Sequence, residues 1–454
     1  MERLDQILEE LHAPMLETLQ KWVRIPSVKA KPEENAPFGK EAAHALAVAL
    51  ADCEALGFPT QNIDWYAGHA DLGEGSDEDA LAILGHLDVV PVGDGWTKEP
   101  FGALIENGKI YGRGTSDDKG PVVAALYAMA AVKKLGVPLK RKVRLILGTD
   151  EESGWEDMAY YQKKCTMPKQ GFSPDAEFPL INIEKGGMHL QLNGSLATTG
   201  LRVIDFQVGE RPNVIPGYAS ALVEGTQALV DEIMAKSYDF PVRAKCTENG
   251  VLIETTGVGG HAAMPELAKN ATGQMLLVLR ENGVEGMLKI LADTIGTTYN
   301  GEHLGIDIKD GISGPLTLNI GIIRANADGV SALLDLRIPV LANHDEILKI
   351  VKLNMPGVEV TVPNTTIPHH VPKNSPLVQG LLKAYEDVTG EKGEPIAIGG
   401  GTYAKCLEEG VAFGSLFPGE EELAHQADEN MSIEGLYKNM KIFAHAIILL
   451  AGKE

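Results

Sequence analysis

The sequence predicts an α/β domain with a mostly parallel sheet flanked by helices, into which a second, α+β domain is inserted. Up to about Gly186 the chain alternates between short apolar strands and helices, as in a sheet covered by helices on its faces. The middle third is richer in strand patterns, and from Ser375 the alternation of strands and helices resumes. With 454 residues the chain is too long for one ordinary core.

The first block begins with two helix patterns and continues with alternating strands and one apolar helix. Gly57 is a stop signal for the second helix. Pro121 suits the first turn of the third helix and Gly136 its end. The expected helices are residues 2–24, 40–56 and 121–135, and the expected strands are 80–84, 109–111 and 142–147.

The middle block, from 187 to 374, is predicted to be the inserted domain. Its expected strands are 188–192, 251–255, 316–323 and 333–339, and its expected helices are 264–291, with an interruption at Gly283, and 344–354. In the last segment, residues 375–454, Ser375 is a candidate N-cap for a helix that ends near Gly390. A strand at 394–401 and a closing helix at 434–451 follow. Residues 1–186 and 375–454 therefore form one predicted domain.

Composition limits the classes of partner. The formal charge of −23 argues against nucleic acid and anionic membranes, because phosphates would be repelled. The four cysteines are far apart and form no CxxC pair, which favours a reducing compartment. The start of the chain has no apolar signal core, and the apolar run at 442–451 is too short to span a bilayer. We therefore expect a cytoplasmic protein.

Acidic and histidine side chains follow several predicted strands. In GHLDVVP, His86 and Asp88 are two residues apart, so in extended chain they share a side just past a strand end. A carboxylate beside an imidazole fixes its tautomer as a metal ligand. The pair could instead simply close a loop. In YGRGTSDDKG, Asp117 and Asp118 precede a helix and could either cap it or bridge metals.

The remaining motifs allow the same two interpretations. KVRLILGTDEESG places Glu151 and Glu152 after a buried strand, where they are either a solvated acidic turn or a metal ligand beside a proton acceptor. Asp175 lies between prolines and could form an Asx turn. His261, in GVGGHAAMPE, and His425, in ELAHQADEN, carry little meaning alone. Together, however, the residues are those used by hydrolytic zinc, manganese or cobalt centres: His86, Asp117, Glu152, Asp175 and His425.

Taken in order along the chain, the motifs resemble those of a known family. GHLDVVPVGDGW, YGRGTSDDKGP, TDEESG, FSPDAEFP, GGHAAMPE, LDLRIP, GGGTYAK and HQADE are similar to the dinuclear metallopeptidases that include aminoacylase, carnosinase and succinyl-diaminopimelate desuccinylase. The closest resemblance is to bacterial peptidase V-like dipeptidases, and it runs from about residue 10 to the last helix.

The resemblance implies two divalent metal ions, with zinc expected and manganese or cobalt as alternatives. His86 and Asp175 would hold one ion, and Glu152 and His425 the other. Asp117 would bridge both, and its peptide bond to Asp118 would be cis.

The resemblance also assigns the other roles. Glu151 would be the general base and acid, Asp88 would orient His86, and His261 would stabilise the oxyanion from the inserted lid domain. The substrate would be bound by Asn213, Arg337, Gly400 and Gly401.

The function implied is hydrolysis of dipeptides with a free N-terminus by a metal-activated water. The long insert resembles the peptidase V type, so a monomer is expected. An N-acyl amino acid deacylase and a non-catalytic peptide-binding protein are the alternatives, although a binding module has no need of a general base such as Glu151.

Overall fold

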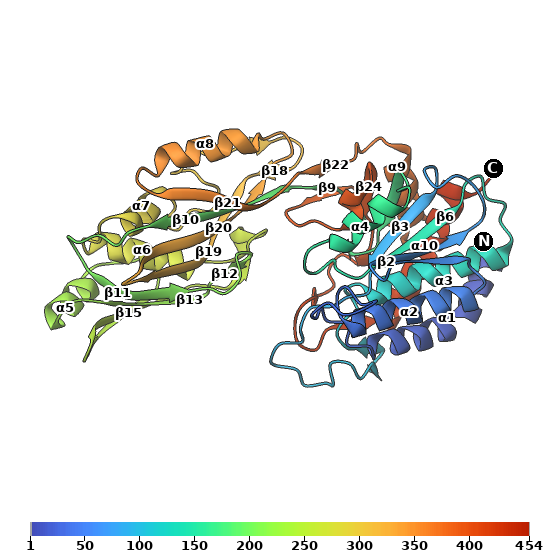
Figure 1. The fold of residues 1–454 in the computed structure, drawn as a ribbon, viewed down its shortest axis with the longest axis horizontal. Coiled ribbons are helices and arrows are strands. Elements are labelled where there is room, and N and C mark those ends of the chain that lie inside the picture. The colour runs from blue at the N-terminus through green and yellow to red at the C-terminus, as the bar shows by residue number, and fades with distance from the viewer. Residues whose placement is uncertain (1, 454) are drawn as a thin grey trace. The chain divides into compact units, whose positions relative to one another are not determined.

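The computed structural model describes residues 2–453, which form two compact units. Unit 1 consists of residues Met1–Asn182, His370–Ile396 and Gly401–Glu454, and unit 2 of Ile183–His369 and Ala397–Gly400. Figure 1 shows both, with the chain entering unit 2 in its green part and returning to unit 1 in its orange part. The sequence had placed the domain boundaries after residues 186 and 374.

Unit 1 is built on a mixed sheet whose central strands are parallel. The strand order is β1-β2-β6-β3-β7-β24-β9. The pairs β6–β3, β3–β7 and β7–β24 are parallel, and the outer pairs are antiparallel. The strands are β1 (Thr60–Ile63), β2 (Ala67–Leu72), β3 (Leu81–His86), β6 (Val143–Gly148), β7 (Gln170–Ser173), β9 (Ile181–Glu184) and β24 (Glu409–Ala412).

Helices cover both faces of this sheet, so its central strands are apolar throughout. In β3, Leu81 and Ile83 join the larger core and Ala82 and Leu84 join the smaller core on the opposite face, as alternation along a strand requires. The larger core includes residues of α1 (Glu2–Val23), α2 (Lys40–Ala55), α3 (Lys119–Leu135), α9 (Pro376–Thr389) and α10 (Ile433–Ala451), and the smaller core includes α4 (Glu156–Lys164) and η2 (Tyr403–Cys406).

Three short strands lie outside the main sheet of unit 1. They are β4 (Leu104–Glu106), β5 (Lys109–Tyr111) and β26 (Asn430–Ser432), in the order β26-β5-β4. Residues 430–432 thus lie beside residues 109–111, although about 320 positions separate them. The strand β25 (Ser415–Leu416) pairs with β8 (Ala176–Glu177).

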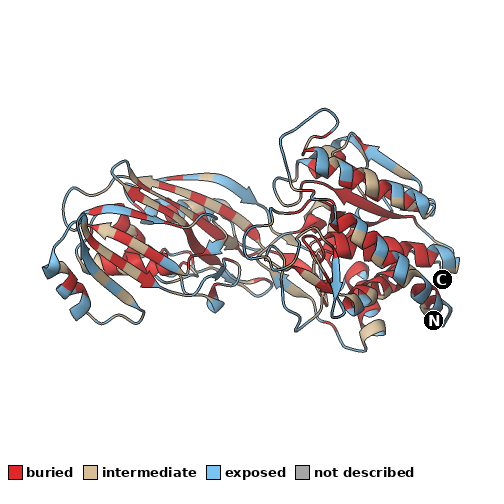
Figure 2. Cartoon of the chain, turned by 90° about the horizontal axis from the view of Figure 1, so that it is seen from below, coloured by how far each residue is buried: buried red, intermediate tan, exposed pale blue. Residues whose placement is uncertain are grey.

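Unit 2 is an eight-stranded antiparallel sheet with helices packed against one face. The strand order is β14-β15-β13-β11-β19-β20-β10-β21. Burial alternates along β10 and β20, and the alternation is visible as colour bands on the strands of unit 2 in Figure 2. Alternate side chains therefore enter a core shared with the helices at 271–281, 287–294 and 344–354. The strands are β10 (Gly186–Gly194), β11 (Val203–Val208), β13 (Tyr218–Val223), β14 (Val242–Thr247), β15 (Gly250–Thr256), β19 (Thr317–Asn326), β20 (Gly329–Ile338) and β21 (Glu359–Thr366).

The helices of unit 2 are α5 (Gln227–Ala235), α6 (Ala271–Glu281), α7 (Met287–Thr294), α8 (His344–Asn354) and the short η1 (Pro265–Leu267). Its two-residue strands pair as β12 (Val214–Ile215) with β16 (Gly260–His261) and as β17 (Lys309–Asp310) with β18 (Gly314–Pro315). Two more short strands, β22 (His369–His370) and β23 (Ile396–Ile398), pair with β9 where the chain passes between the units.

Most predicted elements are present, and one needs correction. The interruption expected at Gly283 in the helix predicted over 264–291 is present, because Gly283 and Gly286 adopt positive φ angles between α6 and α7. The predicted start is wrong, since residues 265–267 form only the short η1, and α6 begins at Ala271 with the side chain of Asn270 as its cap. Among residues 2–453, no helix is both long and apolar enough to cross a bilayer.

Candidate metal centre

Three parallel strands of unit 1 place acidic and histidine side chains at one edge of its sheet. His86 is the last residue of β3, and it pairs with Gly148 at the end of β6. Glu152 follows β6 by four residues, and Asp175 follows β7 by two. Because parallel strands end at the same edge, these three side chains converge there, where open α/β sheets bind ligands.

The other two residues of the cluster arrive through the small sheet. Asp117 lies in the loop between β5 and α3, and His425 lies in the loop before β26. Pairing of β5 with β26 holds these two loops together. His425 has a φ of 64°, a left-handed backbone conformation that the flanking turn supports. We call His86, Asp117, Glu152, Asp175 and His425 the five-residue cluster.

The distances in the five-residue cluster place Asp117 at its centre. Asp117 Oδ1 lies 3.0 Å from His86 Nε2, and Asp117 Oδ2 lies 2.9 Å from His425 Nε2. His86 Nε2 is also 3.6 Å from Asp175 Oδ2, and His425 Nε2 is 2.9 Å from Glu152 Oε1. Each of the two carboxylate oxygens of Asp117 therefore faces a different histidine, and each histidine has a different second acid beside it.

The charges of this cluster fit bound cations. Burial, reinforced by Asp117, raises the pKa of Asp175 to about 6 and that of Glu152 to about 7. Burial opposes protonation of His425, but hydrogen bonds to Asp117 and Glu152 outweigh it and raise its pKa to about 11. Because carboxylates this close repel one another when ionised, they are stable together only if some are protonated or cations lie between them. Two imidazoles and three carboxylates are the donor set of Zn²⁺ and similar divalent ions.

Asp88 connects the strand β3 to the acidic loop after β6. His86 Nδ1 lies 3.0 Å from the carbonyl oxygen of Asp88 and 3.5 Å from its Oδ1. The same carboxylate accepts hydrogen bonds from the backbone N–H groups of Glu151 and Glu152, both at 3.1 Å. Nδ1 of His86 therefore faces Asp88, and Nε2 faces the cluster.

Glu151 lies next to the cluster without belonging to it. Burial raises its pKa well above the usual value; His86 opposes this, and the charges of Asp175, Glu152 and Asp117 add to it. A carboxyl group with a raised pKa can both accept and release a proton near neutral pH.

The capping role considered for the adjacent aspartates is wrong. Asp118 occupies the N-cap position of α3 but makes no side-chain capping bond. Its Oδ2 instead accepts a hydrogen bond from the backbone N–H of His86 at 3.2 Å. The peptide bond between Asp117 and Asp118 is cis, as the resemblance implied.

Sequence reasoning missed a buried ion pair that joins two loops of the cluster. Oε1 of Glu429 accepts hydrogen bonds from the N–H groups of Gly114, Ser116 and Asp117, at 3.0, 3.0 and 3.3 Å. Its Oε2 accepts one from Arg113 Nη1 at 2.7 Å. Both side chains are almost fully buried. Glu429 lies four residues after His425 in HQADE, so its place in that motif was the available signal.

A second set of buried contacts holds the acidic loop. The carboxylate of Asp157 accepts hydrogen bonds from the N–H groups of Thr149 and Asp150, at 2.7 and 3.0 Å, and from the hydroxyl of Tyr403. Lys29 Nζ donates to the buried Asp150 at 2.6 Å. The loop that carries Glu151 and Glu152 is therefore fixed on both sides.

Most of the residues predicted to bind the substrate lie in unit 2. Val214 pairs with His261, and Ala262 N–H donates to Asn213 O at 2.9 Å, so Asn213 and His261 lie on adjoining segments. Arg337 Nη1 donates to Gly399 O at 2.7 Å, next to Gly400. A Cβ on Gly399 would lie 2.9 Å from Ala263 Cβ. Gly401 belongs to unit 1.

Comparison with known proteins decides the family. The family model described as peptidase family M20/M25/M40 matches residues 82–449, which include the whole five-residue cluster. The chain belongs to this peptidase family.

The relatives in this peptidase family cover nearly the whole chain. A protein of Bacillus subtilis (strain 168) named "Putative dipeptidase YtjP" is 38% identical over 455 residues, 96% of this chain and 97% of its own length. The Beta-Ala-Xaa dipeptidase of Lactobacillus delbrueckii subsp. lactis is 35% identical over 434 residues, 93% and 92% of the two chains. Human carnosine dipeptidase 1 has a similar fold, with a TM-score of 0.63, 16% identity and coverage of 99% and 98%.

Proposed function

We propose that this M20-family chain is a metal-dependent dipeptidase that hydrolyses dipeptides with a free N-terminus. The observation that carries the proposal is the five-residue cluster with Glu151 beside it, in which Asp117 faces two histidines at 2.9 and 3.0 Å. The dipeptidase names of relatives that match nearly the full length support the substrate class.

We propose that the five-residue cluster binds two divalent ions, which its two imidazoles and three carboxylates support. His86 and Asp175 would hold one ion, Glu152 and His425 the other, and Asp117 would contact both. We propose zinc, with manganese or cobalt as alternatives, because imidazole and carboxylate donors suit all three. Bound ions of this kind polarise a carbonyl and make water a strong nucleophile at neutral pH.

The chain's own residues supply proton transfer and orientation. Glu151 accepts the proton of the attacking water and returns it to the leaving amine, a task suited to its raised pKa. Asp88 holds His86 in one ring orientation and, through two backbone hydrogen bonds, positions the loop of Glu151 and Glu152.

Unit 2 is proposed to act as the lid that binds the substrate. His261 would donate to the oxyanion, and Asn213, Arg337 and the glycines 400 and 401 would bind the substrate backbone and carboxylate. A preorganised donor of this type is worth about 3–4 kcal/mol in the transition state. A lid that closes over both ends of the substrate would limit its length to two residues.

The decisive test removes the proton acceptor and leaves the metal ligands. In Glu151→Gln we expect near-normal metal content and loss of nearly all dipeptide hydrolysis, measured on the same sample. Glu156→Gln, an exposed acid in the same segment, is the matched control and should retain activity. Near-normal turnover in Glu151→Gln would remove Glu151 from the mechanism.

The same assay separates the neighbouring activities. Free dipeptides should be hydrolysed, whereas N-acetyl and N-succinyl amino acids should not. Preference for the acylated amino acids would instead identify a deacylase, and absence of all turnover in the metal-loaded chain would identify a binding protein.

We also propose that the protein is cytoplasmic and monomeric. No disulfide bond joins its four cysteines, all of which lie in the described part of the chain. Cell fractionation and light scattering of the purified chain test the compartment and the oligomeric state.

A further inference from the structure

The strand β20 places two charged side chains together on one face of the sheet in unit 2. Alternate residues of a strand share a side, so Asp335 and Arg337 point to the same face. The residues before, between and after them, 334, 336 and 338, are fully buried in the hydrophobic core on the other face. The charged pair therefore lies outside the core, on the polar side of the sheet.

Asp335 depends on Arg337 for its counter-charge. The side chain of Asp335 is 1% exposed, and its Oδ2 accepts a hydrogen bond from Arg337 Nη2 at 2.7 Å. Its Oδ1 is buried and accepts no hydrogen bond from any residue in the range 2–453, and no other cation in that range pairs with this carboxylate. A buried carboxylate that loses its one cation is strongly unfavourable. The guanidinium of Arg337 is therefore held at Asp335.

The guanidinium of Arg337 is fixed at both terminal nitrogens and keeps donors to spare. Nη2 donates to Asp335, and Nη1 donates to the carbonyl oxygen of Gly399 at 2.7 Å. A guanidinium carries five N–H groups, so each terminal nitrogen retains one more. Two parallel N–H groups are the arrangement that binds a carboxylate in a bidentate manner. The side chain is 17% exposed, so it is not fully enclosed.

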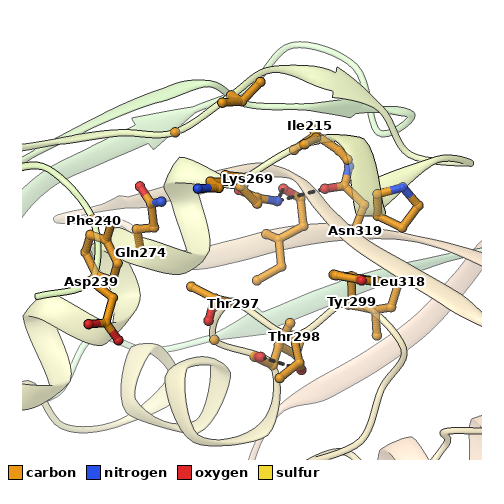
Figure 3. Close-up of a pocket in the computed structure, with 18 of the residues that line it drawn as sticks. Ile215, Asp239, Phe240, Lys269, Gln274, Thr297, Thr298, Tyr299, Leu318 and Asn319 are labelled. Carbon is orange, nitrogen blue, oxygen red and sulfur yellow. Dashed lines mark hydrogen bonds between the residues drawn. The ribbon is translucent and has the colours of Figure 1, made fainter.

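The neighbouring strand supports a second segment predicted to bind substrate. Asn319 of β19 lies opposite Asp335, and its Nδ2 donates to the carbonyl oxygens of Pro212 and Val214, both at 2.9 Å. Figure 3 shows Asn319 at the edge of a cavity of about 530 Å³, where its Oδ1 accepts a hydrogen bond from Asn270 Nδ2 at 2.7 Å. The polar face of the sheet therefore holds both Arg337 and the segment 212–214 in place.

We propose that Asp335 is a positioning residue for the substrate carboxylate and acts through Arg337. It holds the guanidinium in one orientation before substrate arrives, so less side-chain freedom is lost when the carboxylate binds. Asp335 thereby sets the preference for a free C-terminal carboxylate over a neutral C-terminal amide. This inference rests on the proposed function, in which Arg337 binds the carboxylate of a dipeptide.

The test compares L-leucylglycine with L-leucylglycinamide, in which a neutral amide replaces the carboxylate, and measures kcat and KM for both in the metal-loaded chain. The wild type should favour the free dipeptide in kcat/KM, and Arg337→Met should abolish most of that preference. Asp335→Ala should lower the preference about tenfold, mainly through a higher KM for the free dipeptide. In an Arg337→Met background, Asp335→Ala should change it less than about twofold, since Asp335 acts through Arg337.

Three further variants separate positioning from folding. Asp335→Asn keeps an acceptor oxygen for Nη2 and should retain most of the preference. Asp328→Ala removes an exposed aspartate between β19 and β20 and is the matched control. Asp335→Ser, whose hydroxyl is too short to reach Nη2, takes the place of the alanine variant if that variant does not fold. An unchanged preference in Asp335→Ala would overturn the inference. So would an equal loss with both substrates, because Asp335 would then serve the fold alone.

A second readout does not depend on activity. Phenylglyoxal labels arginine side chains, and peptide mapping by mass spectrometry gives the labelling rate of Arg337 in the metal-free chain. The rate should be higher in Asp335→Ala than in the wild type, with Arg202, an exposed arginine of unit 2, as the internal reference. Equal rates would overturn the inference. If the wild type hydrolyses no dipeptide, the proposed function fails, while the labelling still decides whether Asp335 holds Arg337.

Discussion

Replacing Glu429 with glutamine should weaken both the fold and the metal affinity of the centre. Glu429 is fully buried, and its two oxygens face different donors. A glutamine amide has one oxygen and one NH2 group. In either orientation the NH2 group would face a donor, either the guanidinium of Arg113 or the backbone N–H groups of Gly114 and Ser116.

The magnitude follows from the burial of the pair. Arg113 is 1% exposed, so the substitution leaves a guanidinium without a counter-charge inside unit 1. Loss of one partner of a buried ion pair costs about 3–5 kcal/mol. Because Glu429 also bonds the backbone of Asp117, we expect metal affinity to fall about 10–100-fold, as for other outer-shell partners of metal ligands.

The assay is denaturant unfolding of the chelated protein, followed by metal titration of the folded protein. Glu434→Gln is the matched control, because Glu434 is 77% exposed and pairs with Lys438 on α10. That change should leave the free energy of unfolding nearly unchanged. The double variant Arg113→Met with Glu429→Gln should be less destabilised than the sum of the single variants, since both charges are gone.

A cost below about 1 kcal/mol for Glu429→Gln, together with additive single effects, would refute this account. It would mean that the buried pair between Glu429 and Arg113 does not hold the loop of Asp117.

Three further predictions concern other parts of the chain. Chelation should abolish hydrolysis and lower the thermal midpoint, because the acids of the cluster then repel one another; zinc, manganese or cobalt should restore both, and full activity of a metal-free sample would contradict this. Burial lowers the pKa of His69 to about 4, so as the pH falls the unfolded chain is protonated at His69 before the folded chain is. The contribution of His69 to the free energy of unfolding is therefore fully present above about pH 6.5, and up to about 3 kcal/mol of it is lost as the pH falls from 6.5 to 4. His69→Gln should flatten that decline in denaturant titrations of the chelated protein; an unchanged slope would exclude His69. Phe206→Ala removes a fully buried ring from the core of unit 2 and should cost about 3–5 kcal/mol, with faster hydrogen exchange confined to 183–369.

The long elements and the five-residue cluster could be predicted because their signals are local. Ser375 caps α9 through its hydroxyl, and Gly136 ends α3 in a left-handed conformation, as their residue types indicated. His86 and Glu152 follow the predicted strands 80–84 and 142–147, so the rule for parallel sheet edges was enough to bring these two together. The strand before Asp175, β7, was not predicted, and Asp175 was assigned to the cluster by the family resemblance.

The parts that could not be predicted depend on distant pairing. The two-residue strands β12 and β16 have no periodicity of their own and exist because Val214 lies opposite His261. The hydrogen bonds of Glu429 and Asp157 join segments whose meeting is decided by the tertiary fold.

The late position of β24 has a consequence for biosynthesis. This strand lies between β7 and β9, so a chain that ends before Glu409 lacks an interior strand of the sheet in unit 1 and also lacks His425. The main segment of unit 2, Ile183–His369, is continuous and can complete its folding while the ribosome still holds the rest. Truncated products would therefore contain a folded insert but no complete cluster, so the growing chain has no means of cleaving peptides before its synthesis is almost finished.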